Sequence, residues 1–194
     1  MLQTGYTPLK GFTTWVKIYK MEVPLKIETE RLILSPLKES DIPLITEYLQ
    51  EKIISDNTSN IPYPYSESDA RTWIKMSDDA LTAKTGYTFA IREKEGEIIG
   101  AIGLHDRNGD KAELGYWIAV PFWNKGYATE AAAAILSFGI KELKFHKIYA
   151  THFIHNPASG RIMEKIGMHK EAVLKHHIKK DGHYLDIQMY SIII

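Results

Sequence analysis

One stretch, ELGYWIAVPFWNKGYATEAAAA from Glu113 to Ala134, constrains the fold more than any other part of this sequence. Alternating side chains run from Ala112 to Ile118, as in a β-strand. Pro121 and Gly126 then interrupt regular structure, and an alanine-rich segment that begins near Thr129 favours a helix. The stretch therefore predicts a strand, a glycine loop and a helix in immediate succession.

Gly126 determines what this loop can bind. Glycine has no β-carbon, so a ligand can approach its backbone closely, and the unpaired amides of the following helical turn point toward that ligand. This geometry suits an anion, above all a phosphate. The alternative is structural: Gly126 forms a tight turn and the alanines pack against the rest of the protein.

The composition indicates one globular domain and argues against several function classes. With 44% hydrophobic and 25% charged residues, the 194-residue chain can bury a sizeable core. Its 24 basic and 24 acidic residues balance, which argues against nucleic acid or a membrane as a partner. The absence of cysteine excludes a disulfide and a thiol nucleophile. No apolar run approaches the ~20 residues that span a bilayer and no signal peptide is found, so we expect a cytoplasmic protein.

The N-terminal third of the chain divides into an appendage and the start of a domain. Residues 1–20 lack periodicity and capping signals, so we expect an extended tail or a misassigned start, followed by a single domain over residues 21–194. In that domain, TERLILSPL at 29–37 predicts a first strand near a sheet edge, and Ser40 is expected to cap a short helix to Tyr48. Residues 55–65, rich in Asn and Pro, predict an irregular loop.

The remaining chain predicts a mixed sheet with helices. Ser66 and Asp69 form an approximate capping box for a helix to about Ala83. Further strands are expected at 87–92, 98–105, 112–118, 147–154, 168–176 and 184–193, with helices at 129–143 and 158–166. The helix at 129–143 lies between two strands as in a crossover between parallel strands. The fold class is therefore α+β, with a central mixed, mostly antiparallel sheet flanked by helices.

Three separated stretches carry a resemblance to a known family: ELGYWIAVPFWNKGYATEA, NPASGRIMEKIGM and KKDGHYLDIQMYSI, in that order. They resemble the GNAT superfamily of acetyl-CoA-dependent N-acetyltransferases. IPYPYSESDARTWI and ELGYW resemble its RimJ/RimL branch, which acetylates ribosomal-protein N-termini. The resemblance covers about Ile27 to the end of the chain. It implies the GNAT fold with splayed parallel strands, and direct acetyl transfer from acetyl-CoA to a primary amine of a protein N-terminus or a small molecule.

The resemblance also implies the contacts to acetyl-CoA. The family's phosphate loop begins with Gln or Arg, whereas Trp123 stands here. The residues expected to hold the pyrophosphate are Asn124, Lys125, Gly126, Tyr127, Ala128 and Thr129. A bulge in the family's preceding strand places Ile118, Ala119 and Val120 beside the pantetheine arm, with one of their amides donating to the thioester oxygen. Asn156 is expected to bind the pantetheine amide, to cap its own helix, or both.

Two residues are candidates for the catalytic groups. Many relatives carry a helix tyrosine that protonates the departing thiolate, but Met163 stands at that position and cannot donate a proton. Ser159 resembles the residue of the ribosomal-protein branch and is expected to hydrogen-bond the leaving sulfur, unless it only stabilises the helix start. Glu113 is the candidate general base, on the strand face of Gly115 and Trp117; the rival interpretation is a solvated or paired carboxylate.

The sequence bears less directly on the amine acceptor and other partners. An α-amine with a pKa of ~7.7 to 8.0 is easily deprotonated, whereas a lysine at ~10.4 costs about 4 kcal/mol, so a modest base favours an α-amine. The 55–65 loop and the last hairpin are expected to shape the acceptor pocket. The eight histidines form no metal-ligand pattern, so no metal is expected. A non-catalytic acyl-CoA-binding or partner-binding module on the same fold remains the alternative, and the chain could also form a homodimer.

Overall fold

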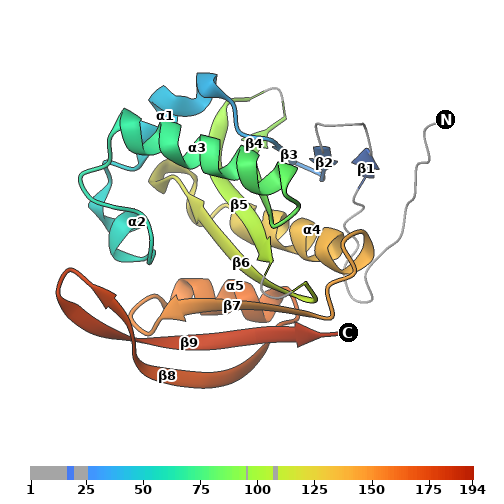
Figure 1. Ribbon diagram of the computed structural model, residues 1–194, viewed down its shortest axis with the longest axis vertical. Coiled ribbons are helices and arrows are strands. Elements are labelled where there is room, and N and C mark those ends of the chain that lie inside the picture. Colours follow the sequence, from blue (N-terminus) through green and yellow to red (C-terminus); the bar gives the residue numbers. More distant parts are fainter. Residues whose placement is uncertain (1–16, 20–25, 95, 107–108) are drawn as a thin grey trace.

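The computed structural model describes residues 17–19, 26–94, 96–106 and 109–194 (Figure 1). Most of the expected appendage lies outside the described residues, as do Glu95 and Asn108 between the strands expected at 87–92, 98–105 and 112–118. The helices are η1 Glu39–Asp41, α1 Ile42–Tyr48, α2 Lys52–Asp56, α3 Glu67–Thr82, η2 Val120–Phe122, α4 Tyr127–Lys141 and α5 Pro157–Lys165. The strands are β1 Lys17–Tyr19, β2 Lys26–Glu28, β3 Leu32–Ser35, β4 Gly86–Glu93, β5 Ile98–Asp106, β6 Lys111–Ile118, β7 Lys147–Phe153, β8 His169–Lys180 and β9 His183–Ile193.

The described strands form one nine-stranded sheet in the order β1-β2-β3-β4-β5-β6-β7-β9-β8. All neighbouring strands are antiparallel except β6 and β7, which are parallel and are connected through α4 (Figure 1). The mixed, mostly antiparallel sheet and the parallel crossover are therefore confirmed. Within the stretch expected as an appendage, Lys17–Tyr19 pairs with β2 as the first strand of the sheet.

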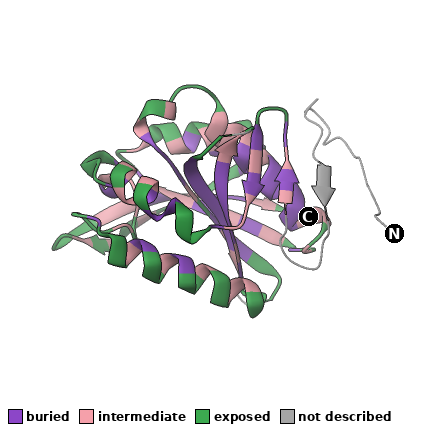
Figure 2. Ribbon diagram, turned by 90° about the horizontal axis from the view of Figure 1, so that it is seen from above, coloured by how far each residue is buried: buried purple, intermediate pink, exposed green. Residues whose placement is uncertain are grey.

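Helices cover both faces of the sheet, and each face has its own core. On one face, α4 and α5 pack against the strands, and Ile135 and Leu114 are buried there. On the other face, α1 and α3 pack over the sheet, and Ile74 and Trp117 are buried. Figure 2 shows the central strands buried and the outer faces of the helices exposed. Strand β6 thus sends alternate side chains into two different cores, as a period of two requires.

Helix α3 begins as predicted, whereas α1 does not. The Ser66 hydroxyl accepts from the Asp69 amide at 3.2 Å, and the Asp69 carboxylate accepts from the Ser66 amide at 2.8 Å. Ser40 was expected to cap the first helix, but it lies inside the 3₁₀ turn η1, so that prediction was wrong. Asp41 is the N-cap residue of α1 without a side-chain bond to that helix; its carboxylate accepts from the Lys38 amide at 2.8 Å and so closes the 3₁₀ turn η1.

Some predicted boundaries were wrong by a few residues. Helix α4 begins at Tyr127 rather than near Thr129, because Gly126 adopts φ +80 and already serves as its N-cap. Helix α2 ends at Asp56, inside the segment 55–65 that was expected to be irregular throughout. Among the described residues, no helix is long and apolar enough to cross a membrane.

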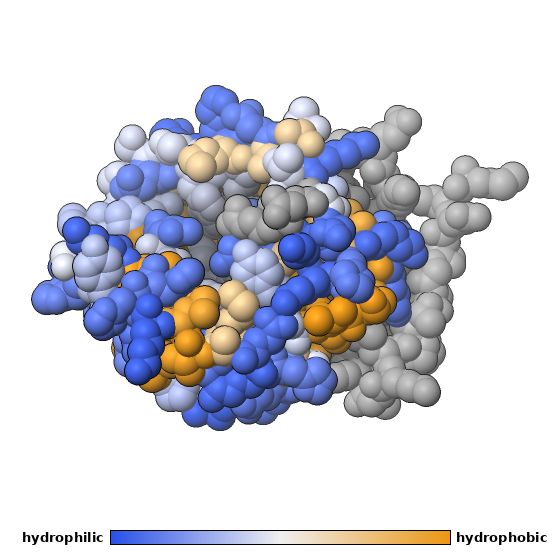
Figure 3. Space-filling model, turned by 60° about the horizontal axis from the view of Figure 1, so that its bottom comes forward, coloured by the Kyte–Doolittle hydropathy of each residue, from blue (hydrophilic) through white to orange (hydrophobic). Residues whose placement is uncertain are grey.

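Strand β8 forms the outer edge of the sheet, next to β9. Most of its twelve residues are exposed. Figure 3 looks onto this side of the molecule and shows apolar patches among hydrophilic side chains. The exposed large apolar residues of the C-terminal part of the chain include Ile154, Val173 and Ile193. The hairpin of β8 and β9 therefore extends from the body, with its tip near α2 (Figure 1).

Candidate active site

The parallel strands β6 and β7 separate after a short common stretch. They pair only at Lys111 with Lys147, Ala112 with Ile148, and Glu113 with Tyr149, although β6 continues to Ile118 and β7 to Phe153. The resemblance implied a bulge in β6, but its pairing with β5 is unbroken from Ala112 to Ile118. The splay is thus present without a shift of β6 against β5. On the edge that faces β7, the backbone groups at the end of β6 therefore have no partner among the described strands.

The hydrogen-bond alternation of β6 decides which amide faces this splay. The Ala119 amide donates to the Ile99 carbonyl at 2.9 Å, so it is already engaged. Backbone groups of successive residues point to opposite edges of an antiparallel strand, so the Ile118 amide points toward β7. The Ile118 carbonyl on the same edge accepts from Trp123 Nε1 at 2.7 Å. Val120 already belongs to η2, so Ile118 carries the candidate donor among the three residues expected beside the pantetheine.

The glycine loop leaves the N-terminus of α4 open to a ligand. Gly126 is the N-cap, and it brings no side chain to the first-turn amides of Tyr127, Ala128 and Thr129. The starts of α3 and α5, by contrast, are capped by Ser66 and Asn156. An L side chain rarely adopts φ +80, so this turn depends on glycine. The expected phosphate cradle therefore has the backbone geometry that an anion requires.

Sequence reasoning missed the residue that holds this loop, Arg31. Its Nε donates to Glu130 Oε2 at 2.7 Å, and its NH1 donates to the Lys125 carbonyl at 2.9 Å. Its guanidinium also lies 4.7 Å from the centre of the Tyr127 ring. Glu130 accepts a further hydrogen bond from Thr29 Oγ1 at 2.6 Å. No local pattern in the sequence pairs these residues, because the fold alone brings the turn before β3 to the glycine loop.

A cavity of about 480 Å³ lies against the start of α4. Gly126, Thr129 and Ala133 line it from α4, Arg31 from the turn before β3, and Lys165 from the end of α5. The cations of Arg31 and Lys165 and the carboxylates of Glu30 and Glu130 thus border the uncapped start of α4. Of the expected contacts, Lys125 instead directs its ammonium over the Phe122 ring at 5.0 Å and contributes its carbonyl to Arg31.

The start of α5 presents a pair of hydroxyl groups. Asn156 Oδ1 accepts from the Ser159 amide at 3.3 Å, which is the capping role. Ser159 Oγ lies 2.7 Å from Tyr116 Oη, whose side chain comes from β6. Burial raises the pKa of the Tyr116 phenol to about 12, while the bond to Ser159 opposes this shift. Met163 is 1% exposed in the core, so it offers no donor here. Tyr116 stands in the ELGYW motif, but its contact to Ser159 was not anticipated.

Glu113 lies where β6 and β7 stop pairing. Its side chain is on the face of β6 that α1 and α3 cover, opposite the face of Tyr116. Its Oε2 is 3.5 Å from Tyr149 Oη, which donates to it from β7. Two residues further along β6, a β-carbon added to exposed Gly115 would meet nothing within 4 Å. The open space over Gly115 is bounded along the strand by Glu113 and by buried Trp117. Glu113 and Ser159 therefore approach the splay from opposite faces of the sheet.

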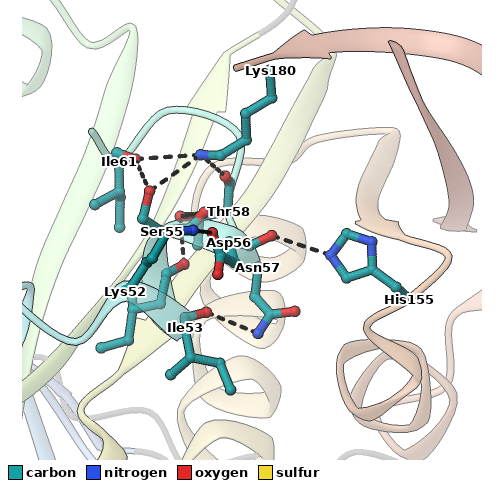
Figure 4. Close-up of polar contacts among 10 residues, drawn as sticks. Lys52, Ile53, Ser55, Asp56, Asn57, Thr58, Ile61, His155 and Lys180 are labelled. Atoms are coloured by element: carbon teal, nitrogen blue, oxygen red, sulfur yellow. Dashed lines mark hydrogen bonds and ion pairs between the residues drawn. The ribbon is translucent and has the colours of Figure 1, made fainter. Parts of the chain in front are cut away.

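The segment from Ser55 to Ile61 borders this second face and is held from two directions (Figure 4). From the tip of the last hairpin, Lys180 Nζ donates to the Thr58 carbonyl at 2.9 Å, to Ser55 Oγ at 3.3 Å and to the Ile61 carbonyl at 3.4 Å. From the turn before α5, His155 Nε2 donates to the Asp56 carbonyl at 3.1 Å. Burial lowers the pKa of Lys180, and the nearby Asp181 and Asp56 oppose this. The loop and the last hairpin therefore contact each other through Lys180.

Other candidate groups take structural positions. Tyr65 and Trp117 are buried, and the Trp117 ring lies 6.5 Å from that of Trp73, so these aromatic residues belong to the core. Within the described ranges, no group of three or more His, Asp or Glu side chains gathers as a metal ion would require.

Known proteins are similar to this chain in sequence and in fold. The acetyltransferase (GNAT) domain matches residues 31–169. The uncharacterized N-acetyltransferase YnaD of Bacillus subtilis (strain 168) is 32% identical over 171 residues, which cover 87% of this chain and 97% of YnaD. A GNAT-family acetyltransferase from Bacillus anthracis superposes with a TM-score of 0.78 at 30% identity, covering 87% of this chain and 98% of the other. RimL, a ribosomal L7/L12 alpha-N-protein acetyltransferase solved with coenzyme A, shares the fold with a TM-score of 0.78 at 18% identity, covering 85% and 95%.

The fold, with splayed parallel strands beside the uncapped start of α4, is the one that these acetyltransferases share. The chain belongs to the GNAT family of acetyltransferases, and it is an N-acetyltransferase.

Proposed function

We propose that this protein transfers the acetyl group of acetyl-CoA to the α-amine of a protein N-terminus or of a small molecule. One observation carries the proposal: the β6–β7 splay lies between a helix N-terminus suited to phosphate and a carboxylate on the opposite face of β6. An acyl carrier and an amine can therefore meet from opposite faces of the sheet.

The residues present suit a carrier with phosphate groups. The first-turn amides of α4 receive no side-chain cap, Arg31 and Lys165 border the adjoining cavity, and Gly126 removes the β-carbon from the approach. Each exposed interaction with a helix terminus contributes only ~0.3 to 1 kcal/mol, so several amides must act together. The departure at Trp123 is compatible with this role, because its indole fixes the loop to the Ile118 carbonyl and leaves the amides free.

Acetyl-CoA, when bound, supplies the acetyl group as a thioester. The Ile118 amide is the donor for the acyl oxygen, a contact that can stabilise the transition state by roughly 2.7 to 4 kcal/mol. Ser159 Oγ donates to the leaving sulfur, and Asn156 orients the start of α5. Glu113 Oε2 takes the proton that the amine loses, directly or through water, which contributes typically 10² to 10⁴-fold.

We favour an α-amine for two reasons: Glu113 is only a weak base, and there is open space over Gly115 on the same face of β6. An α-amine with a pKa of ~7.7 to 8.0 needs little help to lose its proton at neutral pH. The space over Gly115, between Glu113 and Trp117, leaves room for a chain end. The structural neighbour RimL acts on a protein N-terminus, which supports peptides with ribosomal-protein N-terminal sequences as the first acceptors to test.

The test is a thiol-release assay with acetyl-CoA against a panel of amines: ribosomal N-terminal peptides, free amino acids, polyamines and amine antibiotics. Release of coenzyme A with one N-terminal peptide or amino acid is the expected result. Release with side-chain amines alone would overturn the α-amine assignment. Tight acetyl-CoA binding without release from any amine would favour the alternative, an acyl-CoA-binding module.

The role of Glu113 is tested by Glu113→Gln, with Glu97→Gln at an exposed position just before β5 as the control. We expect the turnover number to fall by about 10²-fold and its pH profile to shift, because the amide cannot accept a proton and only the titration of the amine remains. Steady-state rates across pH provide the measurement. An unchanged rate and profile would remove Glu113 as the base.

A further inference from the structure

Two hydroxyl groups face one another between the sheet and α5. Tyr116 Oη, from β6, lies 2.7 Å from Ser159 Oγ and 3.4 Å from the Ser159 carbonyl. Tyr116 stands three residues beyond Glu113, where β6 last pairs with β7. The contact therefore lies alongside the splay, on the face of β6 that α5 covers.

This contact fixes a side chain that is otherwise free to rotate. The Ser159 amide is held by Asn156 Oδ1 at 3.3 Å, which orients the backbone but leaves three staggered positions for Oγ. A bond between Oγ and Tyr116 Oη selects one of them. Because burial raises the pKa of Tyr116 to about 12, its phenol stays protonated at neutral pH and keeps a hydrogen to donate. When Tyr116 donates to Ser159 Oγ, the serine hydrogen is directed to another acceptor.

We propose that Tyr116 is the positioning residue for Ser159, and that its phenol orients the Ser159 hydroxyl toward the leaving sulfur of coenzyme A. This inference rests on the proposed function, which places Ser159 at that sulfur. A chain of two hydrogen bonds, each polarising the next, strengthens the donor that faces the sulfur. Buried Met163 cannot supply such a donor from α5, so the phenol reaches the helix start from the sheet instead.

The proton balance of the step needs no other reactant. The electron pair of the amine nitrogen forms the new carbon–nitrogen bond, and the electron pair of the breaking carbon–sulfur bond passes to sulfur, to which Ser159 holds its hydrogen bond. The amine loses one proton to Glu113 or water, and the thiol gains one from the same pool. Tyr116 and Ser159 end the step with the protons they had at its start.

The experiment measures the acidity of the thiol of coenzyme A bound to the protein, from the difference absorbance of its thiolate across pH. The variants are Tyr116→Phe, Ser159→Ala and the double variant. The matched control is Tyr190→Phe, which removes a hydroxyl bonded to Glu164 of the same helix at 3.0 Å. A donor at sulfur stabilises the thiolate, so we expect Tyr116→Phe to raise the pKa of the bound thiol by about one unit and Ser159→Ala by as much or more.

The double variant shows whether Tyr116 acts on the thiol pKa through Ser159 or whether the two residues act on it independently. If Tyr116 acts through Ser159, the double variant raises the thiol pKa no further than Ser159→Ala alone, and Tyr190→Phe leaves it unchanged. Additive shifts, no shift in Tyr116→Phe, or an equal shift in Tyr190→Phe would each overturn the proposal. These outcomes are distinct from failure of the proposed function, in which the wild-type protein would not bind coenzyme A or would release no thiol with any amine.

Discussion

On each side of the splay, a cationic side chain from a distant element holds a loop by donating to its backbone carbonyls. The two cations differ in whether a carboxylate also contacts them. On the cofactor side, Arg31 donates to the Lys125 carbonyl and pairs with Glu130 at 2.7 Å. On the acceptor side, Lys180 donates to the Thr58 and Ile61 carbonyls. In both cases a cation from a distant element fixes a loop by its backbone. Arg31 has a carboxylate in direct contact, whereas the three oxygens that accept from Lys180 are all neutral.

This difference bears on which side can vary. A guanidinium that bonds a carboxylate and a carbonyl together has a fixed geometry, and few other side chains reproduce it. Among the described residues, the Lys180 ammonium has only neutral oxygens in direct contact, and burial lowers its pKa although Asp181 and Asp56 oppose this shift. In the proposed function, we therefore expect the loop assigned to acetyl-CoA to tolerate fewer substitutions than the loop assigned to the amine. The predictions below test that division, from the largest expected effect to the smallest.

Gly126→Glu should abolish acetyl-CoA binding, with affinity weakened more than about 100-fold, because a carboxylate would occupy the anion site and repel phosphate. Gly126→Asn is the control, since asparagine tolerates positive φ and brings no charge. Calorimetric titration with acetyl-CoA measures both variants. Unchanged affinity in Gly126→Glu would show that the loop is not the phosphate site.

Gly115→Leu should impair the acceptor without affecting acetyl-CoA. The added side chain would enter the open space on the face of Glu113, so we expect the KM for the amine to rise by roughly 30-fold. The dissociation constant of acetyl-CoA should stay within about twofold of the wild-type value. Equal losses for both substrates would mean that the two faces of β6 do not separate the two binding sites.

Arg31→Met should weaken acetyl-CoA binding about tenfold, because the glycine loop loses its bonds to Arg31 and Glu130 is left without its charge partner. Arg71→Met is the matched control, since Arg71 is exposed on α3 and pairs only with Glu67 of the same helix in the described contacts. Thermal unfolding of each variant checks that the sheet remains folded. Full affinity in a folded Arg31→Met would contradict the role of Arg31.

Local patterns in the sequence predicted much of the fold. The capping box at Ser66 follows from two residues three positions apart, and the crossover through α4 follows from a strand, a helix and a strand in direct succession. The glycine loop is equally local, so neighbouring residues in the sequence are enough to indicate Gly126 as the candidate cofactor site. The start of α1 was misplaced because Ser40 lies in a 3₁₀ turn that precedes the helix, and the sequence pattern does not separate such a turn from the first turn of an α-helix.

The missing parts of the site all depend on long-range contacts. Arg31 meets Glu130 across 99 positions, and Lys180 meets Thr58 across 122. The register of β6 with β5 also decides which β6 amide faces the splay, because the Ala119 amide donates to the Ile99 carbonyl of β5. A residue's type and neighbours indicate what it can donate or accept, whereas its partner is set by how the elements pack.

Lys180→Met should produce the smallest effect and the one most specific to the acceptor side. Losing the bonds to the Ser55–Ile61 segment should raise the KM for the amine about threefold, while affinity for acetyl-CoA stays unchanged. Lys179→Met is the matched control, because the neighbouring Lys179 is exposed and its ammonium lies 5.6 Å from the Tyr184 ring. Steady-state kinetics with each substrate varied in turn separate the effect on the amine from the effect on acetyl-CoA. If Lys180→Met instead weakens acetyl-CoA as strongly as Arg31→Met does, the two anchors act on one coupled site, and the division between a fixed and a variable side fails.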